Sequence, residues 1–207
     1  VCPPRLAQRQ VVIVPIYKDD GQRSGVVTKA HEIRTRLQAS GLRVRVDDRA
    51  HLSPGAKYYE WERKGVPLRM EIGPRDLESG KVVLVKRVRG EGEERKEFLP
   101  ESQALAELPA RLDAFQAMLL EQARARREAA SHRGVSTFGE LAEILNGPGG
   151  FVYTGWSGDP AVEARVKEET GGTLRCIPGP DFASAVRPES CVGGGKAAME
   201  VVWAKAY

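Results

Sequence analysis

In its first hundred residues the chain alternates between short apolar segments, typical of strands, and longer segments with helical spacing. The first strand-like segment, residues 10–16, is almost continuously apolar, as in a strand that is covered on both faces. Further segments follow, strand-like at residues 42–46, 67–72 and 81–86 and helix-like at residues 26–39 and 54–64. Because strands that alternate with helices are joined by right-handed crossovers, the sequence predicts an α/β fold. We expect a mixed, mainly parallel five-stranded sheet with helices on its faces.

Short motifs predict where some of these elements begin and end. Ser53 and Pro54 suit the N-cap and the first position of a helix. Residues 73–80 have the composition of a turn between two strands. A long helix is predicted for residues 101–132, which are rich in Ala, Leu, Glu, Arg and Gln. Pro109 lies inside this segment and predicts a break or a kink, because proline lacks the N–H that an inner turn needs.

The composition changes after the long helix, which predicts a second domain. Residues 134–207 contain two short helical patterns and three strand-like segments, with a loose Gly- and Pro-rich stretch at residues 178–195. We therefore expect a first domain at residues 1–115, a connector helix at residues 116–133 and a small α+β domain at residues 134–207.

The overall composition is that of a soluble globular protein. Of the 207 residues, 41% are hydrophobic and 29% are charged. No apolar run approaches the length of a membrane span, and the N-terminus lacks a signal-peptide pattern, so no membrane partner is expected. Cys2, Cys176 and Cys191 are too few and too scattered for a disulfide framework. We therefore expect a cytoplasmic protein.

The charge is unevenly distributed along the chain. Residues 1–100 carry 21 Lys and Arg against 14 Asp and Glu, and residues 101–207 carry 11 against 14. The first half is therefore net positive, at +7, and the second half net negative, at −3. A basic first half suits a polyanion such as nucleic acid. A well-solvated basic surface without a partner is the alternative.

The segment at residues 54–76 carries the chemistry that the sequence offers. It combines a helix crowded with aromatic and charged groups, a Gly-Val-Pro turn, an alternating strand and a Gly-Pro-Arg-Asp corner. We expect these elements to place cationic and carboxylate side chains close together at the end of a small sheet. Such a cluster suits the edges of bases, which offer both donors and acceptors. It contains no Ser, Cys or His constellation for bond breaking, so no catalytic residue is predicted.

Several motifs resemble prolyl-tRNA synthetase of the archaeal/eukaryotic type. They are the QVVIVPI run at residues 10–16, GVPLR at residues 65–69, EIGPRD at residues 71–76 and the final WAKAY at residues 203–207. The resemblance covers essentially the whole chain and implies an anticodon-binding domain followed by the smaller C-terminal domain of that enzyme. The motifs at residues 65–76 are shared with related synthetases of the His/Thr/Gly/Pro group. The helix that follows, the RCIP segment at residues 175–178 and the Tyr207 terminus narrow the resemblance to the prolyl enzyme.

The resemblance also implies what lies outside this chain. In the family, the class II catalytic domain precedes the segment that matches the first residues here. That domain would join proline to its tRNA with ATP and Mg²⁺, so this fragment, without cofactors of its own, is expected to be inactive alone. The implied partners are the anticodon stem-loop of proline tRNA and the catalytic domain, in a homodimeric parent enzyme. The carboxylate of Tyr207 is expected to approach that domain; packing of Tyr207 on its own domain is the alternative.

The family's zinc site is an exception to the resemblance. Many members carry a Cys-x4-Cys pair and a later Cys-x2-Cys pair, which together form a tetrahedral thiolate site. The first pair aligns here with Ser157 and Val162, and the second retains Cys191 but has Gly194 near its other position. Cys176 lies outside both pairs. No metal site is therefore predicted.

The resemblance assigns base recognition to particular residues. Proline tRNAs share two adjacent anticodon guanines, whose donors suit a carboxylate and whose O6 and N7 acceptors suit Arg or Lys. The predicted reading set is Glu62, Arg69, Arg75 and Asp76, with Lys57 and Glu60 as helpers and Tyr58, Tyr59 or Trp61 as stacking groups. Ordinary surface ion pairs are the alternative for Glu62 with Arg69 and for Arg75 with Asp76. Trp61 is assigned to the core, and one of the two tyrosines is expected to be exposed.

Two other functions compete with this assignment. A stand-alone tRNA-binding accessory module would use the same surface, and an upstream class II domain in the reading frame would exclude it. A flavodoxin-like enzyme or nucleotide-binding domain would need a phosphate loop after the first strand. Residues 17–23 contain only one glycine, which disfavours such a loop.

Overall fold

The structure is a computed structural model that describes residues 1–89, 92 and 94–206. The chain divides into two compact units, Val1–Glu121 and Gln122–Tyr207. The boundary lies inside the segment for which the sequence predicts a connector helix. No helix in the described part of the chain is long and apolar enough to cross a membrane.

A five-stranded mixed sheet forms the centre of the first unit, as predicted. Its strands are β1 (Val11–Pro15), β2 (Val44–Val46), β3 (Leu68–Ile72), β4 (Lys81–Lys86) and β5 (Lys96–Pro100), in the spatial order β2-β1-β3-β4-β5. β1 pairs with β2 and β3 in parallel, whereas β3 with β4 and β4 with β5 pair antiparallel. The sheet is therefore evenly mixed rather than mainly parallel, because the last two strands are joined without crossover helices.

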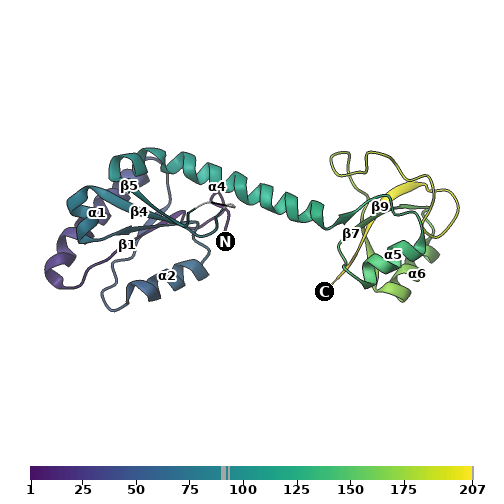
Figure 1. Cartoon of the computed structure of the whole chain (residues 1–207), viewed down its shortest axis with the longest axis horizontal. Coiled ribbons are helices and arrows are strands. Elements are labelled where there is room, and N and C mark those ends of the chain that lie inside the picture. Colours follow the sequence, from purple (N-terminus) through teal and green to yellow (C-terminus); the bar gives the residue numbers. More distant parts are fainter. Residues whose placement is uncertain (90–91, 93, 207) are drawn as a thin grey trace. The chain divides into compact units, whose positions relative to one another are not determined.

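Helices cover both faces of this sheet (Figure 1). They are α1 (Asp20–Ala39), α2 (Pro54–Arg63), the short α3 (Pro74–Ser79) and α4 (Glu101–Ala129). Buried residues of α1 and α4 share one core with the strands, and α2 packs on the opposite face. This two-sided cover confirms the α/β expectation.

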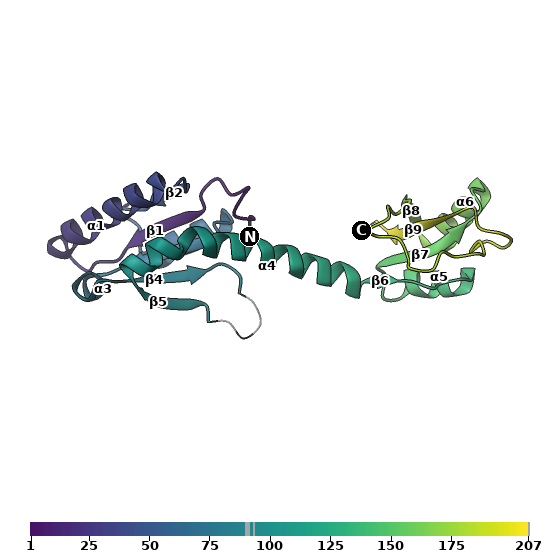
Figure 2. The ribbon, with the colours of Figure 1, turned by 90° about the horizontal axis from the view of Figure 1, so that it is seen from above.

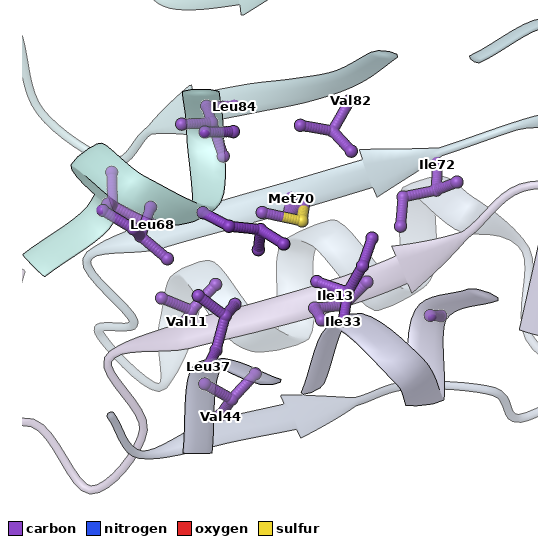
Figure 3. Packing of buried hydrophobic residues seen from close by; sticks show 14 of the residues in the cluster. Val11, Ile13, Ile33, Leu37, Val44, Leu68, Met70, Ile72, Val82 and Leu84 are labelled. Atoms are coloured by element: carbon purple, nitrogen blue, oxygen red, sulfur yellow. The ribbon is translucent and has the colours of Figure 1, made fainter. Parts of the chain in front are cut away.

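The side-chain alternation of the strands explains the two cores. Val11 and Ile13 of β1 point to the face covered by α1 and α4, whereas Val12 and Val14 point to α2. Figure 3 shows the larger core, in which Met70 of β3 lies among aliphatic side chains from neighbouring strands and from α1. Because β1 is buried on both faces, its sequence is continuously apolar.

The helix termini follow local capping chemistry. Ser53 caps α2 as predicted, because its hydroxyl accepts a hydrogen bond from the Ala56 amide at 3.3 Å. α1 begins before the predicted residue 26, since Asp19 caps it by accepting from the Gln22 amide at 2.9 Å. The predicted turn at residues 73–80 contains the short helix α3. α4 runs through Pro109 without ending.

The second unit is α+β, as expected. Its elements are β6 (Ser131–His132), α5 (Phe138–Asn146), β7 (Phe151–Trp156), α6 (Pro160–Thr170), β8 (Gly172–Cys176) and β9 (Met199–Lys205). The strands form a sheet in the order β6-β7-β9-β8, and the long helix ends before β6 rather than at residue 132. Trp203 is fully buried in its core, where the indole Nε1 donates to Thr154 Oγ1 at 2.8 Å.

Candidate nucleic-acid interface

Glu62 and Arg69 come together where α2 connects to β3. Glu62 lies in the last turn of α2, and Gly65 ends that helix with a φ of +76°, which a side chain would disfavour. The chain then enters β3, whose second residue is Arg69. Arg69 Nη1 donates to Glu62 Oε1 at 3.2 Å. The structure thus joins two of the predicted reading residues in one ion pair.

Arg69 is held on three sides. Its Nε donates to Glu71 Oε1 at 2.9 Å, and its guanidinium carbon lies 3.8 Å from the centroid of the Tyr58 ring. Arg69 is only 8% exposed and Glu71 only 5%. Burial raises the pKa of the Tyr58 phenol to about 12, and the charge of Glu71 adds to the increase. The phenol therefore stays neutral, and the guanidinium is fixed between a carboxylate and a ring.

Three further cations surround the two carboxylates. Arg95 Nη2 donates to Glu62 at 2.7 Å, Arg87 Nη1 lies 3.8 Å from the same carboxylate, and Lys96 Nζ donates to Glu71 at 3.2 Å. The Arg87 Nε is buried and has no hydrogen-bond acceptor within the described residues. We call this group of six, namely Glu62, Arg69, Glu71, Arg87, Arg95 and Lys96, the Glu62 cluster. Its four cations outnumber its two carboxylates, so it carries a net positive charge.

Arg75 and Asp76 lie elsewhere in the first unit. Both belong to α3, which Figure 2 shows at the end of the sheet where β4 begins, whereas Arg87 follows the other end of β4. Within the described chain, no hydrogen bond or ion pair joins Arg75 or Asp76 to the Glu62 cluster. The strand from Arg69 to Ile72 alone spans roughly 10 Å. The prediction that all four reading residues form one compact group is therefore wrong.

The two α3 residues are also not paired with each other. Asp76 Oδ2 accepts the Gly73 amide at 2.8 Å, which closes a cap at the start of α3. Arg75 is exposed, and its guanidinium has no hydrogen-bond or ion-pair partner in the described part of the structure. The alternative of an ordinary Arg75–Asp76 ion pair is thus not met, whereas Glu62 and Arg69 do form one.

The two predicted helpers on α2 belong to a separate polar network. Lys57 is only 2% exposed, and its Nζ donates to the Asp47 carbonyl at 3.1 Å. Glu60 accepts from Arg49 at 2.7 Å and from Lys64 at 2.5 Å. The structure therefore contradicts a surface role for Lys57, because its ammonium fixes α2 to the segment after β2. Glu60 reaches the surface, but its oxygens already have cationic partners.

The aromatic residues of α2 divide between packing and exposure. Tyr59 is 70% exposed, whereas Tyr58 is half-buried against the sheet, so the expectation that one of the two is exposed is confirmed. Trp61 packs on the valines of β1 and donates its Nε1 hydrogen to Asp47 Oδ2 at 2.8 Å. Tyr59 is thus the aromatic residue of this helix with a free face for stacking.

Sequence reasoning missed four members of the Glu62 cluster. Glu71 was detectable, because residues two apart on a strand share a face and Arg69 was already selected. Lys96 is brought near by the β4–β5 register, in which it lies opposite Val85. Arg87 directly follows β4 and Arg95 directly precedes β5, so the two residues lie at the two ends of the loop that joins these strands. No local motif marks these three cations, because only strand pairing places them beside Glu62.

The residues at the family's zinc positions do not fit a zinc ion. Cys191 is buried, and its Sγ lies 3.5 Å from Ser157 Oγ. Val162 and Gly194 offer no ligand atoms in their side chains. No group of three or more His, Cys, Asp or Glu that could hold a metal occurs among the described residues. A single thiol cannot provide the four-ligand set of a structural zinc site. The predicted role of Tyr207 lies outside the described residues.

Comparisons with known proteins identify both units. The family model "Anticodon binding domain" matches residues 10–111, and the model "Prolyl-tRNA synthetase, C-terminal" matches residues 138–207. The chain belongs to the prolyl-tRNA synthetase family. It corresponds to the anticodon-binding and C-terminal domains of that enzyme.

Individual synthetases match along the whole chain. Proline–tRNA ligase of Roseiflexus castenholzii is 43% identical over 209 residues, which cover 100% of this chain and 42% of the relative. The chloroplastic/mitochondrial proline–tRNA ligase of Arabidopsis thaliana is 40% identical and is covered to 37%. The solved prolyl-tRNA synthetase of Cryptosporidium parvum, in complex with L-proline and AMP, aligns with a TM-score of 0.85 at 32% identity, over 99% of this chain and 42% of that one. The chain thus spans about two fifths of these synthetases.

Proposed function

We propose that this chain recognises the anticodon stem-loop of proline tRNA as part of a proline–tRNA ligase. The observation that carries the proposal is the Glu62 cluster, in which a partly exposed carboxylate lies within reach of several cations. Guanine offers donors and acceptors on neighbouring edges, so it complements a carboxylate beside a guanidinium. The anticodon-binding family model over the same residues supports this use of the surface.

Two sets of residues are available for the two guanines. The first is Glu62 with the arginines around it, and the second is Arg75 with Asp76 on α3. Single-stranded bases can be splayed apart on a protein surface, so adjacent guanines need not share one pocket. We assign one base to each set, with Tyr59 as a stacking group and Glu60 as an outer contact. Lys57 acts by fixing α2.

The remaining properties of the parent enzyme are also proposals. The relatives are proline–tRNA ligases, which supports ATP and Mg²⁺ chemistry in a catalytic domain that would partner this chain. We further propose that the parent enzyme is a cytoplasmic homodimer. In it, the carboxylate of Tyr207 would approach the catalytic domain. The fragment itself would bind RNA without forming prolyl-adenylate.

The experiment compares guanosine with inosine at each of the two anticodon positions. Inosine lacks only the 2-amino group, which is a donor for a carboxylate. We expect the wild-type chain to bind the guanosine RNA more tightly at both positions, by roughly 5- to 150-fold, since one good base contact contributes about 1–3 kcal/mol. Glu62→Gln should abolish that preference at one position, and Asp76→Asn at the other. Glu168→Gln, which removes an exposed carboxylate of α6, is the matched control.

Two results would contradict this proposal in different ways. Equal binding of guanosine and inosine RNA by the wild-type chain would refute carboxylate reading altogether. A preserved preference in Glu62→Gln or in Asp76→Asn would remove only that residue from the reading set. Circular dichroism of each variant checks that the fold is intact.

A further inference from the structure

A hollow lined by arginines lies at the edge of the sheet, away from the predicted reading residues. It measures about 440 Å³ and is lined by Arg9, Arg34, Gln38, Gly41, Leu42, Arg43, Val44 and Arg45. β2 is the edge strand there, and α1 supplies Arg34. No Asp or Glu is among these lining residues of the described chain. We call it the arginine hollow.

The four arginines have different tasks. Arg43 holds the segment before β1, because its guanidinium donates to the carbonyls of Pro4, Arg5 and Ala7 at 2.9–3.1 Å. Arg34, by contrast, has a buried Nε without an acceptor in the described structure. A buried donor without a partner is costly, so this position favours an anionic acceptor from outside the chain.

Arg9 and Arg45 also form no ion pair in the described part of the chain. The single hydrogen bond of the Arg9 guanidinium goes to the neighbouring Gln8 carbonyl, and no ion pair of Arg45 occurs within the described residues. Within the described residues, Arg9, Arg34 and Arg45 therefore line the hollow without an ion-pair partner, and Asp48 is a carboxylate whose charge acts on Arg45 from outside it. Such a group attracts phosphate, which a guanidinium can bind through two parallel hydrogen bonds.

The arginine hollow continues toward α2. A second hollow of about 280 Å³ shares Arg9 and Arg45 with it and reaches Glu60, Trp61 and Lys64. The carboxylates of this second hollow are occupied: Asp47 by Arg49, Asp48 by His31, and Glu60 by Arg49 and Lys64. The hydrogen bond with His31 leaves the negative charge of Asp48 in place, and this charge acts on Arg45. The arginine hollow itself has no carboxylate among its lining residues. This second hollow connects the arginines to α2, the helix whose last turn carries Glu62.

We infer that the arginine hollow binds phosphates of the RNA backbone next to the bases that are read. The inference rests on the proposed function, and it assigns this edge of the sheet to positioning rather than to base recognition. Continuity with α2 favours RNA over an acidic protein segment as the occupant. The hollow has no exposed apolar anchor, which a protein partner would use.

The test replaces the three unpaired arginines together, as Arg9→Gln, Arg34→Gln and Arg45→Gln, and leaves the structural Arg43 in place. The matched control removes the same charge from exposed positions of the second unit, as Lys167→Gln, Arg175→Gln and Arg187→Gln. Binding of proline tRNA is measured from low to physiological salt. We expect the hollow variant to bind about tenfold or more weakly at low salt, with the logarithmic salt slope reduced by about 2. Its guanosine-to-inosine preference should equal that of the wild type.

The affinity, the salt slope and the guanine preference of the hollow variant test the inference and the proposed function separately. Equal affinity and equal salt slope in the hollow variant and the control variant would overturn the inference, while an intact guanine preference would leave the proposed function standing. A loss of guanine preference in the hollow variant would also overturn it, because the hollow would then contribute to base reading. If the wild-type chain shows no guanine preference, the carboxylate reading in the proposed function fails, and the salt slopes still test phosphate binding.

Discussion

Asp47 is the residue on which the contacts of α2 converge. Its carboxylate accepts from Arg49 at 2.7 and 2.8 Å and from the Trp61 indole at 2.8 Å, and its carbonyl accepts from Lys57. Burial alone would raise the pKa of this carboxyl, but the hydrogen bonds from Arg49 and Trp61 lower it to about 2. The ionised form is thus the one that the fold stabilises.

We therefore predict a pH-dependent effect of Asp47→Asn. Because the pKa is lower in the folded chain than its ordinary value of 3.8, the carboxylate stabilises the fold fully above about pH 4. This contribution, about 2 kcal/mol, is lost as the pH falls from about 4 to 2. The variant should lose that amount of unfolding free energy at pH 7 and nearly none at pH 2, as measured by urea unfolding. Asp181→Asn, an exposed loop change, is the control, and a loss independent of pH would contradict the assignment.

Arg69 illustrates a second consequence of burial. Its three groups of partners, Glu62, Glu71 and Tyr58, leave little freedom for the guanidinium. A preorganised donor loses less entropy when it binds a base, which suits recognition. The exposed Arg75 has no such support. We expect the Glu62 set to contribute more affinity than the α3 set for this reason.

The ten residues of helix α2 have two structural roles. One side of the helix packs on β1 through Tyr58 and Trp61, and the end of the helix delivers Glu62 to the cluster. Lys57 and Trp61 are four residues apart, so they lie on the same side and both reach Asp47. The position of Glu62 thus depends on how firmly α2 is attached.

This dependence gives a prediction for Lys57→Met. The variant keeps the length of the side chain but leaves the buried Asp47 carbonyl unpaired, which should lower the free energy of unfolding by about 1–3 kcal/mol. Because Lys57 does not reach the surface, it cannot contact RNA directly. The folded variant should therefore lose less binding free energy for RNA than it loses free energy of unfolding. Chemical unfolding and RNA titration at a temperature well below the transition measure the two effects.

Lys64→Met is the matched control for that experiment. Its ammonium is exposed and pairs with Glu60, so the stability should change by less than about 1 kcal/mol. A Lys57 variant with full stability and strongly reduced RNA affinity would restore the surface role that the sequence suggested.

The whole chain combines a basic unit that carries the candidate interface with a unit whose stability must come from packing. In the second unit, Trp203 is fully buried among valines and leucines of β7, β9 and the two helices. The one thiol at the family's zinc positions, Cys191, is buried beside Ser157. Hydrophobic burial is therefore the source of stability that the described residues of this unit provide.

We predict that the purified chain contains far less than one zinc per molecule. A chelator should leave its thermal unfolding temperature unchanged, because no thiolate set contributes metal-binding energy to folding. Elemental analysis and calorimetry with and without chelator provide the measurement. Trp203→Ala should instead destabilise the chain by roughly 3–5 kcal/mol, which marks the core as the source of stability. Stoichiometric zinc, or a chelator-induced fall in the unfolding temperature, would contradict this expectation.

Local patterns in the sequence were enough to predict most helices and strands of the fold. The apolar run of β1, the alternation of β3 and the Ser53 cap of α2 each express short-range physics, namely burial on both faces, a period of two and satisfaction of free amides. The family motifs at residues 65–76 likewise lie in one continuous stretch. The predicted start of a helix was wrong where a capping side chain precedes the first apolar residue. Asp19 caps α1 in this way, ahead of the apolar spacing that begins at residue 26.

The candidate site depended on contacts between distant segments. Glu62 and Arg69 are close in sequence, and the ion pair considered for them as an alternative is present. Arg87 and Arg95 join them only through the pairing of β4 and β5. The sequence by itself determined which residue types are present and which elements carry them. The tertiary structure alone decided that Lys57 is buried and that α3 lies apart from the Glu62 cluster. Strand register and helix packing set those distances, and neither is encoded in the spacing of a single segment.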